Sequence, residues 1–407
     1  MTAFYRRTGP LAATLLAGLL GQLAHAQDST FTRLSQRNQY AMILSNTQFS
    51  GPGWDKLQQD VRQSQLVLLG EDHGTAQIPV FATALARELK PAVYVAEIDK
   101  YQAQDLSQFA TQPGLPTAFQ KEHPMGLSFY SWAEEFELAR YLRSQHAAVL
   151  GIDQVSLVST GRFFTMLASK VKSASTKAYL VKRAAAYQAQ DRAKMSKGTA
   201  NFSIYQRPAA LDSLRSLTRT EGPEVQQMVQ DFAASSDIYQ LNQQGDPRSH
   251  QLRIDLMKRN LLQGLAAYQQ LGQPLPTMLF KFGAVHVSRG VSLNGGVYDV
   301  GNLALNLADA HDQKSLHIYI MGQRGTRVQG FNPDDFSKNV AAYSNADDLK
   351  PFAASAGSTA WQVFDLRPLR RALRRDQLKV ASHDLEVTLM GYDYLIIIPE
   401  TTASHNY

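Results

Sequence analysis

The chain has 407 residues, of which 44% are hydrophobic and 19% are charged. This length allows a sizeable core within one large domain or two closely associated domains. The formal net charge is +6, but the basic residues are scattered, so charge alone does not indicate a polyanionic partner. The absence of cysteine excludes disulfides, thiolate metal ligands, a thiol nucleophile and a lipidated cysteine anchor.

The first 26 residues have the organisation of a secretory signal peptide. Arg6 and Arg7 form a charged head, residues 11–23 are almost uninterruptedly apolar, and the segment ends in Ala-His-Ala. A transmembrane anchor is the alternative, but the apolar stretch is shorter than the ~20 residues that span a bilayer. We therefore expect cleavage after Ala26 and a periplasmic or secreted mature chain, residues 27–407, without a stable membrane anchor.

Strands and helices alternate in the first part of the mature chain. Residues 65–69 and 92–96 are short, continuous apolar runs, which is typical of buried parallel strands. Residues 78–89, between them, show helical periodicity. A helical stretch at 134–145 and a strand-like run at 147–152 repeat the pattern. The alternation predicts an α/β fold with a central, mainly parallel sheet and flanking helices.

A long helical segment, residues 156–272, interrupts this alternation, and we interpret it as a large helical insertion. Its predicted helices are residues 163–172, 178–195, 223–239 and 250–270. Strand character returns afterwards at residues 277–282, 316–321 and 394–398. These runs are predicted to complete the sheet that the insertion interrupts.

Arginines are concentrated in one late segment, residues 367–375. Leu366, Leu369 and Leu373 are spaced as on one face of a helix, so the arginines are predicted to cover its outer face. A nucleic-acid-binding patch is the alternative, but no aromatic interleaving or known binding motif accompanies the cluster. We therefore expect no nucleic-acid partner.

Ionisable side chains follow the ends of four predicted strands. Glu71 and His73 follow the first strand, Glu97 the second, Asp153 the third, and His286 the first strand after the helical insertion. Ligands of parallel sheets bind outside the carboxyl ends of the strands, so these side chains are predicted to share one pocket. A helix N-cap is the alternative for Asp153, and an exposed or structural role is the alternative for a single histidine.

Residues 68–75, Leu-Leu-Gly-Glu-Asp-His-Gly-Thr, resemble the signature of the erythromycin esterase family. That signature is a strand followed by Gly-Glu-x-x-His-Gly or by a form one residue shorter. Gly70 with His73 makes one Gly-x-x-His motif, and Gly283 with His286 makes a second. Two such motifs with intervening glutamates are shared by a wider superfamily, which includes ChaN-like haem-binding proteins and the TraB and Tiki metalloproteases.

Other segments resemble the same family in the same order. Tyr-Ser-Trp with Glu135, and the strand that ends at Asp153, are similar to its Trp-containing helix and its Gly-x-Asp strand. Arg253 and Asn260 resemble an Arg-x-x-x-Met-x-x-Asn element, whose spacing places both on one helix face. The resemblance implies that residues 27–407 form one erythromycin esterase-like α/β domain that contains the helical insertion.

Two positions depart from the family pattern. The esterases usually carry a glutamate shortly after His-Gly, where this chain has Gln77, and an aspartate after the insertion arginine, where it has Ile254. Macrolide specificity therefore does not follow from the resemblance, although a hydrolytic core does.

The expected reaction is hydrolysis of an ester or related carbonyl bond. Because cysteine and a Gly-x-Ser-x-Gly elbow are both absent, attack by an activated water is the simpler route, and the resemblance implies it too. We predict that His73 takes the proton from water. Glu71 or Glu97 is predicted to orient its imidazole and stabilise the cationic form.

The remaining candidates are assigned to the substrate, which we expect to be a small molecule. His286, with Arg253 or Arg289, is predicted to stabilise the oxyanion that forms on the carbonyl. The complete predicted substrate-binding set is Arg253, Arg289, Asp153 and Asn260.

Two alternatives keep the same pocket but add a cofactor, although none is expected. His73, His286, Glu71 and Glu97 form an adequate ligand set for a divalent metal ion, which the metalloprotease branch of the superfamily implies. The ChaN-like branch implies a haem-binding protein in which a histidine is an axial ligand.

Overall fold

The computed structural model describes residues 30–199, 201–206, 208–268, 273–343, 349, 351–352, 359–380 and 382–407. The predicted signal peptide and the predicted end of the helical insertion at residues 269–272 lie outside these residues. None of the helices in the described ranges combines the length and apolar character needed to cross a membrane.

The described residues contain a nine-stranded sheet with the order β2-β1-β10-β11-β7-β3-β6-β4-β5. Its strands are β1 (Gln39–Ser45), β2 (Gln48–Ser50), β3 (Leu66–Glu71), β4 (Val93–Ala96), β5 (Ala148–Gly151), β6 (Met278–Gly283), β7 (Ser315–Gly322), β10 (Trp361–Asp365) and β11 (Tyr394–Ile398). A separate antiparallel hairpin is formed by β8 (Thr326–Val328) and β9 (Val340–Ala342).

The six strands from β11 to β5 are parallel, which confirms the predicted mainly parallel α/β sheet. The strand that follows the helical insertion, β6, lies between β3 and β4, and Gly283 is in register with Glu71. The segments that carry His73 and His286 therefore leave the sheet next to each other. The antiparallel edge of β1, β2 and β10 is not in the sequence prediction, although β1 contains the continuous apolar run Tyr40 to Leu44.

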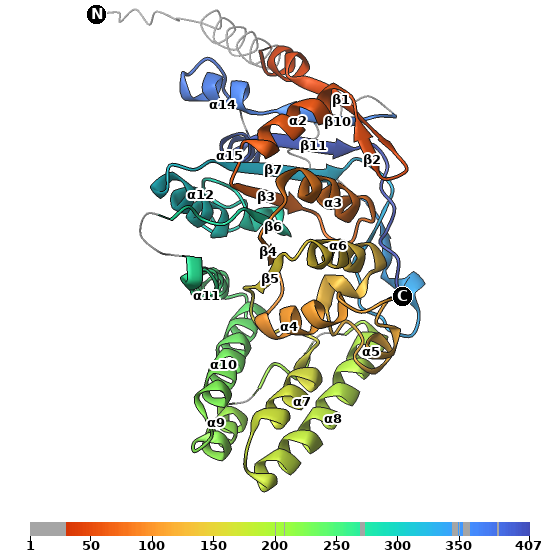
Figure 1. Ribbon diagram of the computed structural model, residues 1–407, viewed down its shortest axis with the longest axis vertical. Helices are drawn as coiled ribbons and strands as arrows, with labels where there is room; N and C mark the ends of the chain where they lie inside the picture. The colour runs from red at the N-terminus through yellow and green to blue at the C-terminus, as the bar shows by residue number, and fades with distance from the viewer. Residues whose placement is uncertain are drawn as a thin grey trace, which may run out of the picture.

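Helices cover both faces of the sheet (Figure 1). They are α2 (Pro52–Arg62), α3 (Gln77–Leu89), α4 (Lys100–Phe109), α5 (Thr117–Glu122), α6 (Ala133–Ser144), α7 (Thr160–Lys170), α8 (Ala174–Lys197), α9 (Pro208–Thr218), α10 (Pro223–Gln243), α11 (Arg248–Gly264), α12 (Val300–Ala310), α14 (Arg367–Arg374) and α15 (His383–Gly391). The short helices are η1 (Ser128–Ser131), η2 (Ala266–Tyr268), η3 (Ala284–His286) and η4 (Phe336–Asn339).

Alternation along the strands explains the two layers of helices. In β3, Val67 and Leu69 pack with α2, α3 and α6, whereas Leu66 and Leu68 pack with α11, α12, α14 and α15. Successive side chains of a strand point to opposite faces, so a continuous apolar run needs apolar cover on both sides. This is why β3 reads as an uninterrupted hydrophobic segment.

Helices α7 to α10 form a bundle beyond the β5 end of the sheet (Figure 1). The bundle has an apolar cluster of its own, in which Phe163, Phe164 and Phe232 pack together. Three helices, α7, α8 and α10, correspond to predicted helical stretches. The sequence prediction lacks α9, since its eleven residues begin at a proline and lie between longer periodic stretches.

The arginine-rich segment is helical, as predicted, but one arginine points inward. Arg370 is buried, and it donates hydrogen bonds to Asp393 and to the carbonyl of Tyr392. Asp393 is itself buried immediately before β11, so it requires a cationic partner there. The prediction that the arginines cover only the outer face of α14 is therefore wrong at this position.

Shortening a buried side chain of the central strand β3 should destabilise the protein. Replacing Leu68, which is fully buried in β3, by alanine should lower the free energy of unfolding by about 2–5 kcal/mol, since it leaves a cavity beneath α11 and α12. The matched variant Leu217→Ala, at an exposed position in α9, should change it by less than about 0.5 kcal/mol. Urea unfolding of both variants tests this, and equal losses would contradict the packing described.

Candidate active site at the carboxyl edge of the sheet

A pocket of about 690 Å³ lies at the carboxyl ends of β3, β4 and β6. Its walls are mostly apolar and aromatic, whereas its floor carries most of the ionisable side chains. The floor comprises Glu71, His73, Glu97, Arg253 and His286, and Asp72 and Arg327 also line the pocket. The walls include Phe129, Trp132, Leu157, Tyr239, Leu293, Tyr319, Val328 and Phe331. Polar chemistry at the base of an apolar cleft is the usual form of a small-molecule site.

His73 is fixed by the sharp exit of the chain from β3. Nδ1 of its ring lies 2.9 Å from Oε1 of Glu71, the last residue of the strand. The ring stacks on Phe129 with 4.1 Å between centroids. Gly74 follows with a φ of +86°, and a Cβ atom there would meet the backbone of Val328, so the turn requires glycine.

Glu97 connects the two histidines and the arginine. Its Oε2 accepts a hydrogen bond of 2.5 Å from the backbone N–H of Gly283 and lies 3.4 Å from Nε2 of His73. Its Oε1 accepts a bond of 2.8 Å from Nη2 of Arg253 and lies 3.5 Å from Nε2 of His286. A Cβ atom on Gly283 would lie 3.1 Å from His73, so glycine allows this close approach.

Arg253 reaches the pocket from α11 and is oriented by Asp153. The guanidinium donates two hydrogen bonds, of 2.9 and 2.6 Å, to the two carboxylate oxygens. Such bidentate pairs fix both the position and the plane of the guanidinium. Asp153 therefore orients an arginine rather than capping a helix, which was the alternative interpretation of its sequence position.

His286 is anchored by a residue that the sequence analysis did not select. Its Nδ1 lies 2.7 Å from Oδ2 of Asp299, and both side chains are buried. Asp299 also accepts a hydrogen bond from the backbone N–H of Val300 at the start of α12. The available signal was an aspartate before a helical stretch, which is indistinguishable from an ordinary N-cap in a sequence.

The surrounding charges determine the protonation of this site. Burial alone would lower the pKa of His73, but the carboxylates of Glu97 and Glu71 raise it to about 10. Burial acts to raise the pKa of Glu97, yet the two imidazole rings and Arg253 hold it well below its usual range. His73 is therefore a cation near neutral pH, and Glu97 is an anion.

Lys281 and Glu135 support the site from beneath; neither was predicted as a site residue, although Glu135 was part of the family resemblance. Nζ of Lys281, in the middle of β6, donates hydrogen bonds of 2.5 Å to Glu71 and 2.6 Å to Glu135. All three side chains are buried. Burial acts to raise the pKa of Glu71, but Lys281 and His73 lower it overall. A lysine inside an apolar strand was the sequence signal, since such a residue needs a buried acidic partner.

Two predicted substrate-binding residues lie elsewhere. Arg289 donates a hydrogen bond of 2.6 Å to Asp393 and lines a different cavity, so its prediction as a pocket residue is wrong. The chain turns away from the pocket after His286, which carries Arg289 toward Asp393. The amide of Asn260 donates to the carbonyl of Ile152 and does not line the pocket, so it supports the strand exit instead.

The arrangement does not fit a divalent metal ion. Arg253 lies between Glu97 and His286, 2.8 Å from the former and 3.2 Å from the latter, where its charge would repel a cation. Nδ1 of His73 faces Glu71, whose Oε1 also accepts from Lys281. Within the described ranges, no group of three or more histidine, aspartate or glutamate side chains is placed to bind a metal.

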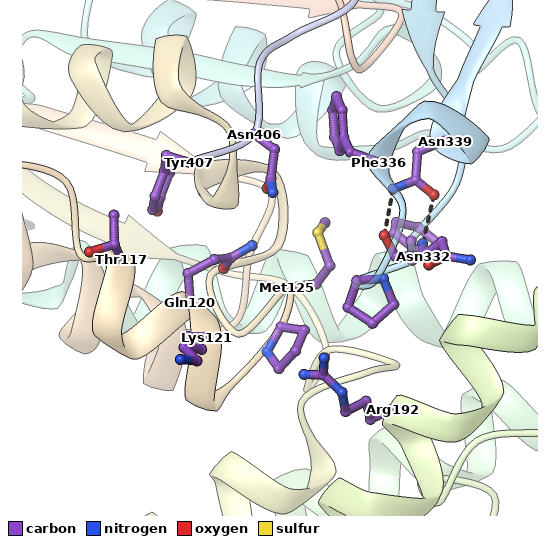
Figure 2. A pocket seen from close by; sticks show the side chains of 13 residues that line it. Thr117, Gln120, Lys121, Met125, Arg192, Asn332, Phe336, Asn339, Asn406 and Tyr407 are labelled. Atoms are coloured by element: carbon purple, nitrogen blue, oxygen red, sulfur yellow. Dashed lines mark hydrogen bonds between the residues drawn. The ribbon is translucent and has the colours of Figure 1, made fainter.

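A second, smaller cavity of about 220 Å³ shares Phe331 with the first. Figure 2 shows Gln120 and Lys121 on one side of it and the mutually hydrogen-bonded Asn332 and Asn339 on the other. The described residues around it include neither a histidine nor a carboxylate side chain. It therefore lacks the imidazole and carboxylate groups that the larger pocket contains.

The fold and the pocket together define an α/β protein with an erythromycin esterase-like fold. A mutant of an erythromycin esterase, solved in its open conformation, matches with a TM-score of 0.53 and 14% identity over 86% of this chain and 94% of that chain. A structure described as a succinoglycan biosynthesis protein matches with a TM-score of 0.57 and 13% identity over 94% of this chain and 99% of that chain.

A protein from Bacillus cereus gives the same picture, with a TM-score of 0.57 and 13% identity over 93% of this chain and 99% of that chain. No protein-family model and no curated protein matches the sequence. At these identities the likeness confirms the fold that the sequence resemblance implied, and the activity is a separate question.

Removing Lys281 should destabilise the folded protein, because its two carboxylate partners are buried. Lys281→Met leaves Glu71 and Glu135 buried without their shared cation, so the free energy of unfolding should fall by about 3–5 kcal/mol. Adding Glu135→Gln should restore much of this loss, because one uncompensated charge is removed. Urea unfolding of the single and double variants measures the effect. A Lys281→Met variant as stable as the parent would contradict the ion-pair account.

The pKa of His73 predicts a dependence of stability on pH. In the folded protein the pKa of His73 is raised to about 10, whereas the ordinary pKa of a histidine is 6.5. The folded state therefore holds more protons between these values, and its stability should fall as pH rises through this window. The difference in unfolding free energy between the parent and His73→Gln isolates this contribution. A difference that stays constant over the window would refute it.

Proposed function

We propose that the protein is a hydrolase that cleaves an ester or related carbonyl bond of a small molecule with water. The observation that carries the proposal is the meeting of two imidazoles and one guanidinium around Glu97 in a single pocket. Acyl transfer to water needs a proton acceptor, a proton donor and a stabiliser of the oxyanion. This pocket supplies a candidate for each.

Arg253 is our candidate for the oxyanion stabiliser. Its Nε and Nη2 are held by Asp153 and Glu97, while Nη1 is directed at His286 beside the open pocket. A donor that is already oriented can stabilise developing charge without reorganising. Burial alone would lower the pKa of Arg253, but the carboxylates of Asp153 and Glu97 hold it well above the ordinary value, so it keeps its charge during turnover.

The walls favour a substrate with an extensive apolar surface. Phe129, Trp132, Leu157 and Tyr319 border the ionisable floor, and Phe331 is 40% exposed at the boundary with the second cavity. The likeness to a solved erythromycin esterase supports a carboxylic ester as the substrate class. Export by the N-terminal segment and the absence of a nucleic-acid partner are further parts of this proposal and rest on the sequence.

A panel of p-nitrophenyl and alkyl esters, tested with the full chain in the presence and absence of a chelator, examines the proposal directly. We expect hydrolysis of bulky apolar esters that the chelator leaves unchanged, because Arg253 occupies the position a metal would need. Arg253→Met should lower kcat by about 100- to 1,000-fold. Loss of turnover on chelation would instead support a metal-dependent enzyme.

The matched control is Arg248→Met on the same helix. Arg248 is exposed and forms a surface ion pair with Asp246, so its removal should leave kcat within about twofold. An equal loss of kcat in both arginine variants would reject the role of Arg253. The absence of any hydrolysis across the panel would reject the hydrolase assignment.

A further inference from the structure

Gln154, which follows β5, carries a buried acceptor atom that the surrounding protein does not satisfy. The residue lines the pocket and is only 7% exposed, and Oε1 of its amide accepts no hydrogen bond from the described residues. Glu71 also has an unpartnered buried oxygen, but its carboxylate is already paired with Lys281 and His73. A buried carbonyl oxygen without a donor is destabilising, so at a pocket wall it points to a donor on the ligand.

Arg253 does not supply the missing donor, although it pairs with the residue that precedes Gln154. Its Nε and Nη2 donate to Asp153 and Glu97, and its Nη1 faces His286. The bidentate pair with Asp153 holds the guanidinium in this orientation. In this orientation the guanidinium donates no hydrogen bond to Gln154. A group of the substrate is therefore the remaining source of the donor.

Tyr239 of α10 lies beside Gln154 and also lines the pocket. The segment after β5 is attached to the same helix, because the backbone N–H of Val155 donates a hydrogen bond of 2.9 Å to Ser235, one turn before Tyr239. Burial and the nearby Asp153 raise the pKa of the Tyr239 phenol, and the Gln154 amide opposes this as a hydrogen-bond donor to its oxygen. The phenol therefore keeps its proton near neutral pH.

The two side chains together are complementary to a hydroxyl group. Since the amide nitrogen of Gln154 donates to the oxygen of Tyr239, the amide oxygen can still accept and the phenolic hydrogen can still be donated. A hydroxyl carries one donor and two acceptor lone pairs, so it satisfies both groups at once. A ketone or an ether has no donor for Gln154, and an ammonium group has no acceptor for Tyr239.

We propose that Gln154 and Tyr239 form a subsite for a hydroxyl group, and that the substrate is an ester with a hydroxyl near the scissile carbonyl. The subsite adjoins the pair of Asp153 and Arg253, so it lies beside the position of the proposed oxyanion. This inference rests on the proposed hydrolase function. An analogue without the hydroxyl leaves both buried groups unpaired, which is the basis of strong discrimination against it.

Paired esters test the subsite during turnover by the full chain. The pairs are p-nitrophenyl octanoate with its 2- and 3-hydroxy derivatives, and ethyl octanoate with 2-hydroxyethyl octanoate. At least one hydroxylated ester should have a kcat/KM about tenfold or more above that of its unsubstituted partner. Gln154→Met should abolish this preference and change kcat/KM on the unsubstituted ester by less than about threefold. Comparison with the variant cancels differences in the intrinsic reactivity of the esters.

Tyr239→Phe is the second variant, because it removes the phenolic donor and keeps the ring, and it should reduce the same preference. Tyr205→Phe is its matched control. Tyr205 packs against Tyr239, with 6.1 Å between the ring centroids, but does not line the pocket. The control should therefore leave the preference within about twofold. No preference in the parent, or equal losses on both esters of a pair in Gln154→Met and Tyr239→Phe, overturns the subsite.

Binding without turnover separates this inference from the hydrolase proposal. Calorimetric titration of the parent with octanoate, 2-hydroxyoctanoate and 3-hydroxyoctanoate should show one hydroxylated acid binding about tenfold more tightly than octanoate. Gln154→Met should bind all three acids with similar affinity. If the parent hydrolyses no ester but shows this difference in Kd, the hydrolase proposal fails and the subsite stands. Equal binding of the three acids by the parent overturns the subsite even if esters are hydrolysed.

Discussion

The burial of acidic side chains at one edge of the sheet is the constraint on which the site depends. Each buried carboxylate requires a neighbouring cation or hydrogen-bond donor, because an isolated buried charge is strongly destabilising. The chain meets this requirement with an alternating line of acidic and basic side chains. In order, the line is Asp299, His286, Glu97, His73, Glu71, Lys281 and Glu135.

The line crosses elements that are distant in sequence, so it joins the floor of the pocket to the sheet. Glu71 ends β3, Glu97 follows β4, and Lys281 lies within β6 between those two strands. Parallel pairing brings the ends of these strands to the same edge. Arg253 lies on α11 and donates a hydrogen bond to Glu97, so it connects this helix to the same line of charges.

The same charges give the two histidines different surroundings. Two carboxylates flank His73, whereas His286 lies between Asp299 and Arg253, with Glu97 3.5 Å from its Nε2. Neighbouring charges of this kind determine the pKa of an imidazole.

Much of the fold was predictable because the strands and helices follow local hydrophobic patterns in the sequence. Continuous apolar runs identified β3, β4, β6, β7 and β11, since a strand covered on both faces must be apolar throughout. The antiparallel edge and α9 were not predicted. Two of the edge strands leave little pattern, because β2 has only three residues and Gln362 interrupts the apolar residues of β10. Position after a strand end also identified Glu71, His73, Glu97 and His286, which the structure brings together.

What the sequence by itself determined was therefore the α/β class and the strand ends that carry ionisable groups. Only the tertiary structure decided the partners: Asp299 for His286, Lys281 for Glu71, and Asp393 rather than the pocket for Arg289. The physical reason is that periodicity and spacing depend on neighbours along the chain. Protonation and ion pairing depend instead on neighbours in space. Those neighbours are determined by the strand order, which places β6 between β3 and β4.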